Sequence, residues 1–137
     1  MIGQLINAKD YTQPLKATVQ RTGRLAFTAK TIEELQIRQG THIFIAPDSE
    51  SKRILWIGVI QEPNDEAFPA KKSGGYYYLD TTKLFDVIGI DFRKKNCTFN
   101  LSRYDENDEA IGGECYKMQL HVTARRNRKT PKKTNKR

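Results

Sequence analysis

The sequence predicts a small, β-rich α+β protein built from two similar strand-strand-helix-strand-strand units that form a pseudo-dimeric barrel or sheet. Short stretches of alternating apolar and polar residues, separated by turn residues, recur along the chain. Each half also holds one helix-like segment, and the two segments align at a constant offset of 53 residues. With 137 residues, 37% of them hydrophobic, the chain is long enough to bury one shared core.

Turn residues and charge divide the chain into five segments. These are an N-terminal arm (1–14), a first unit (15–61), a linker loop (62–75), a second unit (76–123) and a disordered cationic tail (124–137). The linker is assigned as a loop because prolines and glycines recur in it. Three apolar residues of the arm, Ile2, Leu5 and Ile6, are expected to anchor it on the body.

In the first unit, two short strands flank a tight turn at Gly23, where a positive φ angle favours glycine. Thr28 is expected to cap a short helix that buries Ile32 and Leu35. A strand at residues 43–45 follows.

The last strand of the first unit has a different pattern. Residues 54–60 are apolar throughout, which is typical of a strand that is buried on both faces. Trp56 is therefore expected in the core.

The second unit repeats this order of elements. Its strands are expected at 76–79, 97–101 and 116–122, with a helix between the first two. The helix should bury Leu84, Val87 and Ile88 and end at Gly89. At the 53-residue offset, Thr28, Ile32, Leu35 and Ile37 fall on Thr81, Phe85, Ile88 and Ile90.

One part of the first unit resembles a known family. The run Gly23-Arg24-Leu25-Ala26-Phe27-Thr28, followed by residues 35–40 and 43–45, is similar to the AbrB-type DNA-binding unit, and MraZ-like proteins of the same fold carry two such units. The resemblance covers residues 16–45, with a degenerate second copy at 73–101. It implies a swapped-hairpin barrel, a role in transcription regulation, and DNA contacts by basic residues near the turn, here Arg21 and Arg24.

The chain departs from this family pattern at three positions. Thr28 stands where the family has proline, Gln36 where it has glycine, and Thr41 where it has aspartate. The second copy restores the helix-ending glycine as Gly89 but has Tyr76 after its turn glycine, so the arginine is missing. A symmetric DNA interface is therefore in doubt.

The net charge of +8 lies in the tail, because residues 1–123 carry 16 basic and 16 acidic residues. The basic residues of the tail are Arg125, Arg126, Arg128, Lys129, Lys132, Lys133, Lys136 and Arg137. Such a segment is expected to bind phosphates with a strong dependence on salt, so nucleic acid is the expected partner, with DNA favoured over RNA.

Five residues of the body join the tail as candidate nucleic-acid contacts. Arg21, Arg24 and Arg38 lie near predicted turns, and Tyr77 and Tyr78 lie on a strand from which at least one ring should point outward. Two alternatives remain open. The body could bind single strands, as the architecturally similar PUR and Whirly folds do, or it could be a protein-interaction module with a basic docking tail.

The sequence offers no residues for catalysis. His42 and His121 have no second ligand at metal spacing, and no nucleophile has a paired base, so we expect neither an enzyme, a metal nor a cofactor. No apolar run approaches the roughly 18 residues of a membrane span, and no export signal is recognised. Cys97 and Cys115 form no disulfide framework, so we expect a cytoplasmic protein, with homo-oligomerisation left open.

Overall fold

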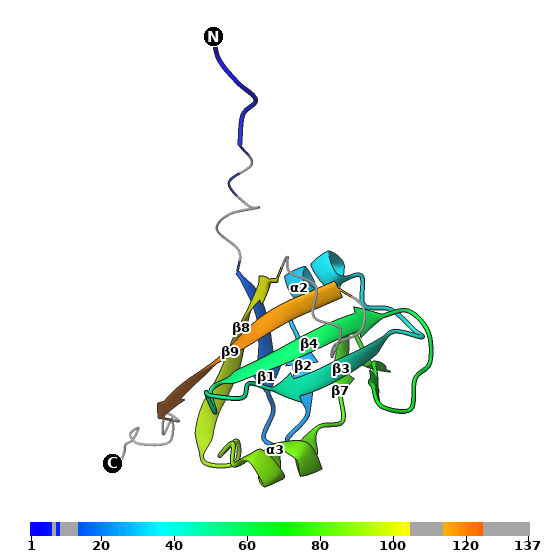
Figure 1. Cartoon of the computed structure of the whole chain (residues 1–137), viewed down its shortest axis with the longest axis vertical. Helices are drawn as coiled ribbons and strands as arrows, with labels where there is room; N and C mark the ends of the chain where they lie inside the picture. The colour runs from blue at the N-terminus through cyan, green and yellow to red at the C-terminus, as the bar shows by residue number, and fades with distance from the viewer. Residues whose placement is uncertain (7, 9–13, 105–113, 125–137) are drawn as a thin grey trace, which may run out of the picture.

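A computed structural model describes residues 1–6, 8, 14–104 and 114–124 of the chain. Its strands form one nine-stranded antiparallel sheet that curls into a nearly closed barrel, with one short helix at each end (Figure 1). The predicted β-rich α+β class is therefore confirmed. The tail from residue 125 onward lies outside the described residues.

The elements follow the predicted order with additions. The strands are β1 (Leu15–Val19), β2 (Leu25–Phe27), β3 (His42–Pro47), β4 (Ile54–Ile60), β5 (Phe68–Pro69), β6 (Lys71–Ser73), β7 (Tyr76–Leu79), β8 (Lys95–Arg103) and β9 (Glu114–Ala124). The helices are α2 (Ala29–Leu35) and α3 (Thr82–Ile88). In the sheet the strands are ordered β5-β3-β4-β9-β8-β1-β2-β7-β6.

The segment between the two halves closes the barrel. β5 and β6 stand at the two ends of the strand order, yet only Ala70 separates them along the chain. The Ala70 N–H donates to the Thr41 carbonyl at 2.8 Å, which continues the pairing with the chain next to β3. The prediction of a plain linker loop at 62–75 was wrong, because backbone groups exposed on β3 and β7 find their partners in this segment.

The core fills the inside of the barrel. Its fully buried aromatic residues are Phe85, Phe92, Phe99 and Tyr116. The alternation predicted for the last two strands is confirmed, since β8 and β9 bury every second side chain over most of their length. Cys97 and Cys115 are buried free thiols.

β4 is buried on one face only, which corrects the prediction of a strand covered on both. Leu55, Ile57 and Val59 point into the core, whereas Trp56 lies on the outer face and is half-buried. The Trp56 indole Nε1–H donates to Asp48 Oδ1 at 2.8 Å, and its ring meets the Tyr104 ring edge-on at 4.8 Å. An antiparallel barrel has no second layer to cover its outside, so apolar residues there become partly exposed.

This indole contact gives Asp48 a titration that can be measured. The hydrogen bond from Trp56, reinforced by the backbone N–H groups of Glu50 and Ser51, lowers the pKa of Asp48 below its ordinary 3.8. Because the folded pKa is depressed, the stabilisation is present at neutral pH and is lost as pH falls through that pKa. We expect Trp56→Phe to raise the pKa of Asp48 toward 3.8 in a carboxyl NMR titration. An unchanged midpoint would show that the backbone donors alone set it.

Two further predictions about apolar residues were wrong. Val87 is 83% exposed, because Phe85, two residues earlier, takes the inward position of α3 and directs Val87 to the opposite side. In the arm, Ile2 and Leu5 are each 90% exposed and Ile6 is 74% exposed. The arm extends away from the barrel (Figure 1), so these side chains lie beyond the reach of the core.

The two helices begin and end in defined ways. Thr28 caps α2 as predicted, with its Oγ1 accepting from the Thr31 N–H at 3.4 Å. The helix then ends at Gln36, whose φ of 55° lies in the left-handed region, and α3 ends at the corresponding Gly89 with a φ of 87°. Gln36 therefore adopts a conformation that is usually taken by glycine at the C-terminus of a helix.

Candidate nucleic-acid interface

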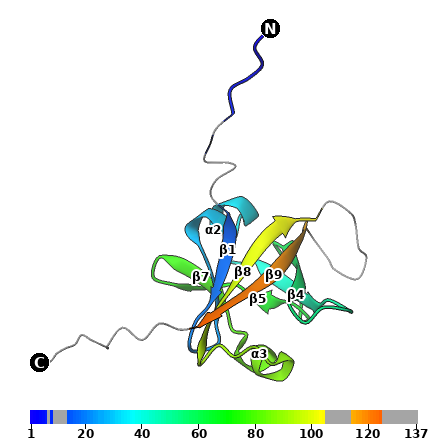
Figure 2. The same ribbon diagram turned by 90° about the vertical axis from the view of Figure 1, so that its left-hand side faces the viewer.

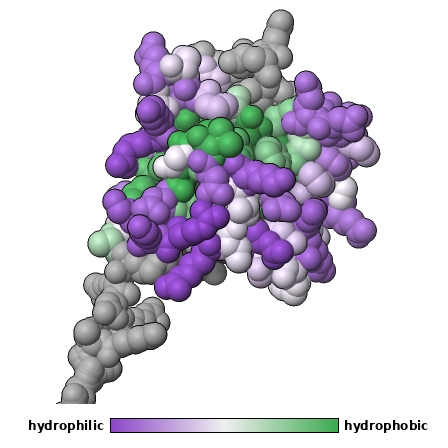
Figure 3. Space-filling model, turned by 90° about the horizontal axis from the view of Figure 1, so that it is seen from below, coloured by the Kyte–Doolittle hydropathy of each residue, from purple (hydrophilic) through white to green (hydrophobic). Residues whose placement is uncertain are grey.

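Basic side chains gather at the end of the barrel that carries α3. We define the basic end as residues 20–24 and 80–95. Its basic residues are Arg21, Arg24, Lys83, Arg93, Lys94 and Lys95, and its acidic residues are Asp80, Asp86 and Asp91, a formal charge of +3. Seen from below, hydrophilic side chains cover most of this end and surround a smaller hydrophobic area (Figure 3).

Two threonines fix the β1–β2 turn against α3. Thr81 Oγ1 donates to the Gly23 carbonyl and Thr82 Oγ1 to the Thr22 carbonyl, both at 2.7 Å. Thr81 aligns with the helix cap Thr28 at the 53-residue offset, but its hydroxyl makes no capping bond to α3 and holds this turn instead. The arginines on either side of Gly23 are thereby placed beside α3.

The register of three strands brings the start of the tail to the same end. Cys97 of β8 pairs with Val19 on one side and Val122 on the other, and Lys95 pairs with Ala124. The last described residues of β9 therefore lie near α3, while α2 lies at the opposite end (Figure 2). Ala124, the residue that precedes the basic segment in the sequence, therefore lies at the basic end.

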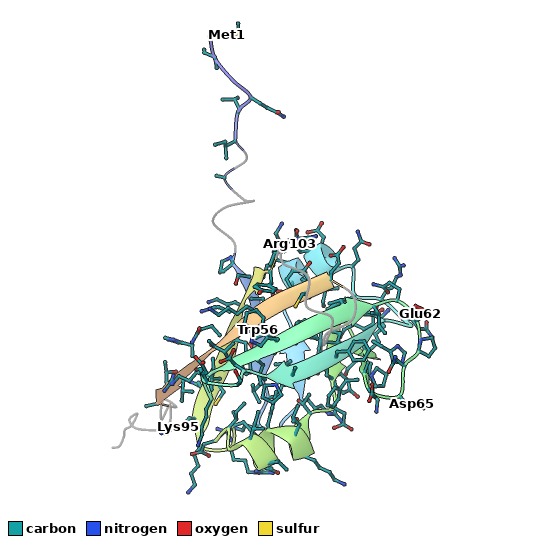
Figure 4. All side chains as sticks on the ribbon, in the orientation of Figure 1. Met1, Trp56, Glu62, Asp65, Lys95 and Arg103 are labelled. Carbon is teal, nitrogen blue, oxygen red and sulfur yellow. The ribbon has the colours of Figure 1, made fainter. Side chains whose placement is uncertain are left out.

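A second region of the surface is acidic: its residues 28–41, at the α2 end, are balanced in charge, and its residues 61–67 carry the excess of acid. We define the acidic end as residues 28–41 and 61–67, which are joined by hydrogen bonds from Gln61 to the Gln36 carbonyl and from Thr41 to Gln61. It carries Lys30 and Arg38 against Glu33, Glu34, Glu62, Asp65 and Glu66, a formal charge of −3. In Figure 4, Glu62 and Asp65 lie far from Lys95, and Arg103 lies near α2. The neutral body is thus electrically polarised.

An aromatic and basic cluster lies on the outer face beside the basic end. The Arg24 guanidinium lies over the Tyr78 ring, 4.4 Å from its centroid, and Gln20 Nε2 donates to the Tyr76 hydroxyl at 3.2 Å. The two tyrosine rings are 6.2 Å apart and tilted by 50°. We call Gln20, Arg24, Tyr76 and Tyr78 the tyrosine face.

The hydrogen bonds of this face hold the Tyr76 ring in place. Donation by Gln20, followed by a contact with Ser73, lowers the pKa of Tyr76 below its ordinary 10.0. The Tyr76 oxygen is therefore engaged as a hydrogen-bond acceptor, which restrains the ring on the side of Gln20.

An ion pair restrains one cation of the basic end. Arg93 donates to both Asp86 carboxylate oxygens, at 2.6 and 3.2 Å, and lies 4.4 Å from the Phe92 ring centroid. This pairing raises the pKa of Arg93 and lowers that of Asp86. Lys94 and Lys95 beside it are exposed.

The structure brings some of the sequence-predicted residues together and separates others. Arg21, Arg24 and Tyr78 lie at or beside the basic end, whereas Arg38 lies at the acidic end. Tyr77 points inward and packs against the core. The predicted tail contacts Arg125, Arg126, Arg128, Lys129, Lys132 and Lys133 lie outside the described residues.

Several members of this surface were not predicted from the sequence. Gln20 and Tyr76 could have been found from strand alternation, because they share the outer face with Tyr78. Lys94 and Lys95 were signalled by the run of three basic residues that begins at Arg93.

The described part of the chain holds no group of three or more His, Cys, Asp or Glu side chains arranged to hold a metal ion. A cavity of about 330 Å³ opens at the α2 end, lined by polar residues and by Leu35 and Val59. His42 and His121 do not line this cavity: His42 Nδ1 lies 3.0 Å from the Gly40 carbonyl oxygen, and His121 is exposed. None of the helices in the described ranges is long and apolar enough to cross a bilayer.

The fold and this surface define only a class, a small antiparallel β-barrel with a basic and an acidic end. Comparison with protein-family models, curated proteins and solved structures gives no match for this chain.

Proposed function

We propose that this protein binds nucleic acid, DNA in the first place, through the basic end of its barrel and the basic residues that follow Ala124. The observation that carries the proposal is the pairing of Ala124 with Lys95, which starts the eight-cation segment at the positive end of a polarised body. Phosphate contacts made by the basic end and by the basic residues after Ala124 then add in binding free energy, because each contact releases condensed counterions. The uneven distribution of charge on the body orients its approach to the polyanion.

A pair of matched charge reversals tests this orientation. Arg21 and Arg38 are both exposed, and neither forms an ion pair within the part of the chain that the structure describes, but they lie at opposite ends of the barrel. We expect Arg21→Glu to weaken DNA binding at 0.1 M salt by at least roughly eightfold, the value of one lost phosphate contact, and Arg38→Glu to have little effect. Fluorescence anisotropy with labelled DNA at two salt concentrations measures both. Equal losses of DNA affinity in the two variants would contradict an interface at the basic end.

We further propose that the barrel is a pseudo-dimer of two related units, as the AbrB and MraZ resemblance implies. Two observations support this. Leu25 pairs with Leu79, and Ala26 pairs with Tyr78. At the 53-residue offset, Leu25 falls on Tyr78 and Ala26 falls on Leu79, so each pair is the counterpart of the other. In addition, β1 pairs with β2 and β8. At the 53-residue offset, β5 and β6 together are equivalent to β1, and they pair with β7 and β3, which are equivalent to β2 and β8.

The missing arginine of the second unit supports an asymmetric interface. Its turn at Gly74-Gly75 corresponds to the turn at Gly23, but Tyr76 follows Gly75 where Arg24 follows Gly23. Under the proposed relation, only the first turn supplies cations for DNA. A role as a transcription regulator or architectural accessory belongs to the same proposal. If no nucleic acid binds at low salt and one acidic protein partner co-purifies, the alternative of a protein-interaction module is favoured.

A further inference from the structure

We infer that the tyrosine face binds unpaired bases of a single-stranded nucleic acid, with Tyr76 and the Arg24–Tyr78 pair as the stacking surfaces. This inference deepens the proposed function and rests on it. It concerns which form of nucleic acid the body recognises, whereas the cations alone would attract any phosphate backbone.

The two rings are held outward and apart. β7 alternates, so Tyr76 and Tyr78 share the outer face while Tyr77 packs against the core. Between them and β1, β2 presents only the small side chain of Ala26, which pairs with Tyr78 and Thr18. No large side chain of β2 therefore stands between these rings and β1, and a flat ligand can reach the rings from that side.

The spacing of the rings favours separated bases. Adjacent bases of a duplex strand are stacked about 3.4 Å apart. The tyrosine centroids are 6.2 Å apart, so neighbouring bases can meet them only after being drawn away from each other. A single strand permits this, whereas base pairing hides the base planes inside the duplex.

Arg24 supplies a second flat surface. Its guanidinium lies 4.4 Å from the Tyr78 centroid, so a base at this position stacks on the guanidinium plane, which the ring supports from below. The Gln20 hydrogen bond fixes Tyr76 beside it. The two stacking surfaces are thus ordered before a ligand arrives, which reduces the entropy lost on binding.

Cations flank the face where a backbone would run. Arg21 is exposed on the adjoining turn. The exposed Lys71 of β6 pairs with Tyr78 and shares its face, whereas Lys72 pairs with the inward Tyr77. Lys71 lies 3.9 Å from Asp80, so it is partly compensated. The combination of aromatic rings and flanking cations is the one that binds single strands without strict sequence preference.

The experiment compares short single-stranded DNA, single-stranded RNA and duplex DNA of the same mixed sequence, bound to the full chain at one low salt concentration. We expect Tyr76→Ala and Tyr78→Ala each to weaken single-strand binding by about fivefold or more and to leave duplex binding unchanged. Arg24→Lys keeps the charge, so it should weaken single-strand binding without altering the salt slope. Tyr76→Phe keeps the ring and should retain binding.

Phe44→Ala is the matched control, because Phe44 is a partly exposed aromatic residue on the outer face of β3, opposite Gly58 and away from this cluster. Thermal melts verify that each variant is folded. If the tyrosine variants behave like Phe44→Ala, or if duplex binding falls equally, the inference fails while the proposed function stands. If the unmodified chain binds none of the three oligonucleotides at low salt, the proposed function itself fails.

Discussion

Replacing Gly23 by alanine is expected to lower the free energy of unfolding by about 3 kcal/mol. A Cβ atom at this position would lie 2.9 Å from Phe92 Cζ, from Thr82 Cα and from Thr82 Oγ1. Overpacking of this kind costs about 1–3 kcal/mol, and the φ of 90° adds about 1–2 kcal/mol for a residue with a side chain. Urea denaturation followed by circular dichroism measures the change.

Gly40→Ala separates these two causes. Gly40 also has a positive φ, 96°, but a Cβ atom there meets nothing within 4 Å. Gly40→Ala should therefore lower the free energy of unfolding only through its positive φ, by about 1–2 kcal/mol. Equal losses at the two positions would show that the close approach of the β1–β2 turn to α3 contributes nothing.

The same comparison bears on the candidate interface. Gly23 lies between Arg21 and Arg24, and its carbonyl accepts the Thr81 hydrogen bond that fixes the turn. If the turn must be ordered for binding, folded Gly23→Ala protein should bind DNA more weakly than folded Gly40→Ala protein. Binding measured well below each denaturation midpoint tests this.

Ending the chain after Ala124 should produce the largest change in DNA binding. The removed segment carries eight cations and no acid. Each phosphate contact contributes about 0.9 to the slope of log affinity against log salt, so the slope should flatten by up to about 7 and the affinity at low salt should fall on the order of 10³-fold. Anisotropy titrations over a salt series measure both quantities.

Two controls accompany the shortened chain. Its unfolding midpoint should match that of the full chain, which verifies that the barrel is intact. Residual binding should remain sensitive to Arg21→Glu, because the basic end is retained. An unchanged affinity together with an unchanged salt slope would exclude any part for the segment after Ala124.

Local patterns were sufficient for much of the fold. The turn at Gly23 and the cap at Thr28 depend on backbone preferences and on hydrogen bonds between residues close in sequence. The alternation in β8 and β9 depends on the two-residue period of a strand. Each of these features was predicted because neighbouring residues alone decide it.

The predictions that the structure contradicts failed for a common reason, the packing between segments that are distant in the sequence. Trp56 lies outside because no second layer covers β4, and Val87 is exposed because Phe85 occupies the core beneath α3. The strands β5 and β6 form because β3 and β7 offer unpaired backbone groups to Phe68–Pro69 and Lys71–Ser73. A single sequence carries little local signal for partners that far apart.

Some features of the candidate interface likewise follow from the sequence, and others follow only from the tertiary structure. The sequence by itself determined that the excess charge lies after residue 124, that residues 1–123 are neutral, and that arginines flank the turn at Gly23. Only the tertiary structure decided that this neutral body has a basic and an acidic end, that Arg38 lies apart from Arg21, and that Tyr76 rather than Tyr77 shares a face with Arg24. The physical reason is that total charge is a sum over the chain, whereas the field at a surface depends on which strands the barrel places side by side.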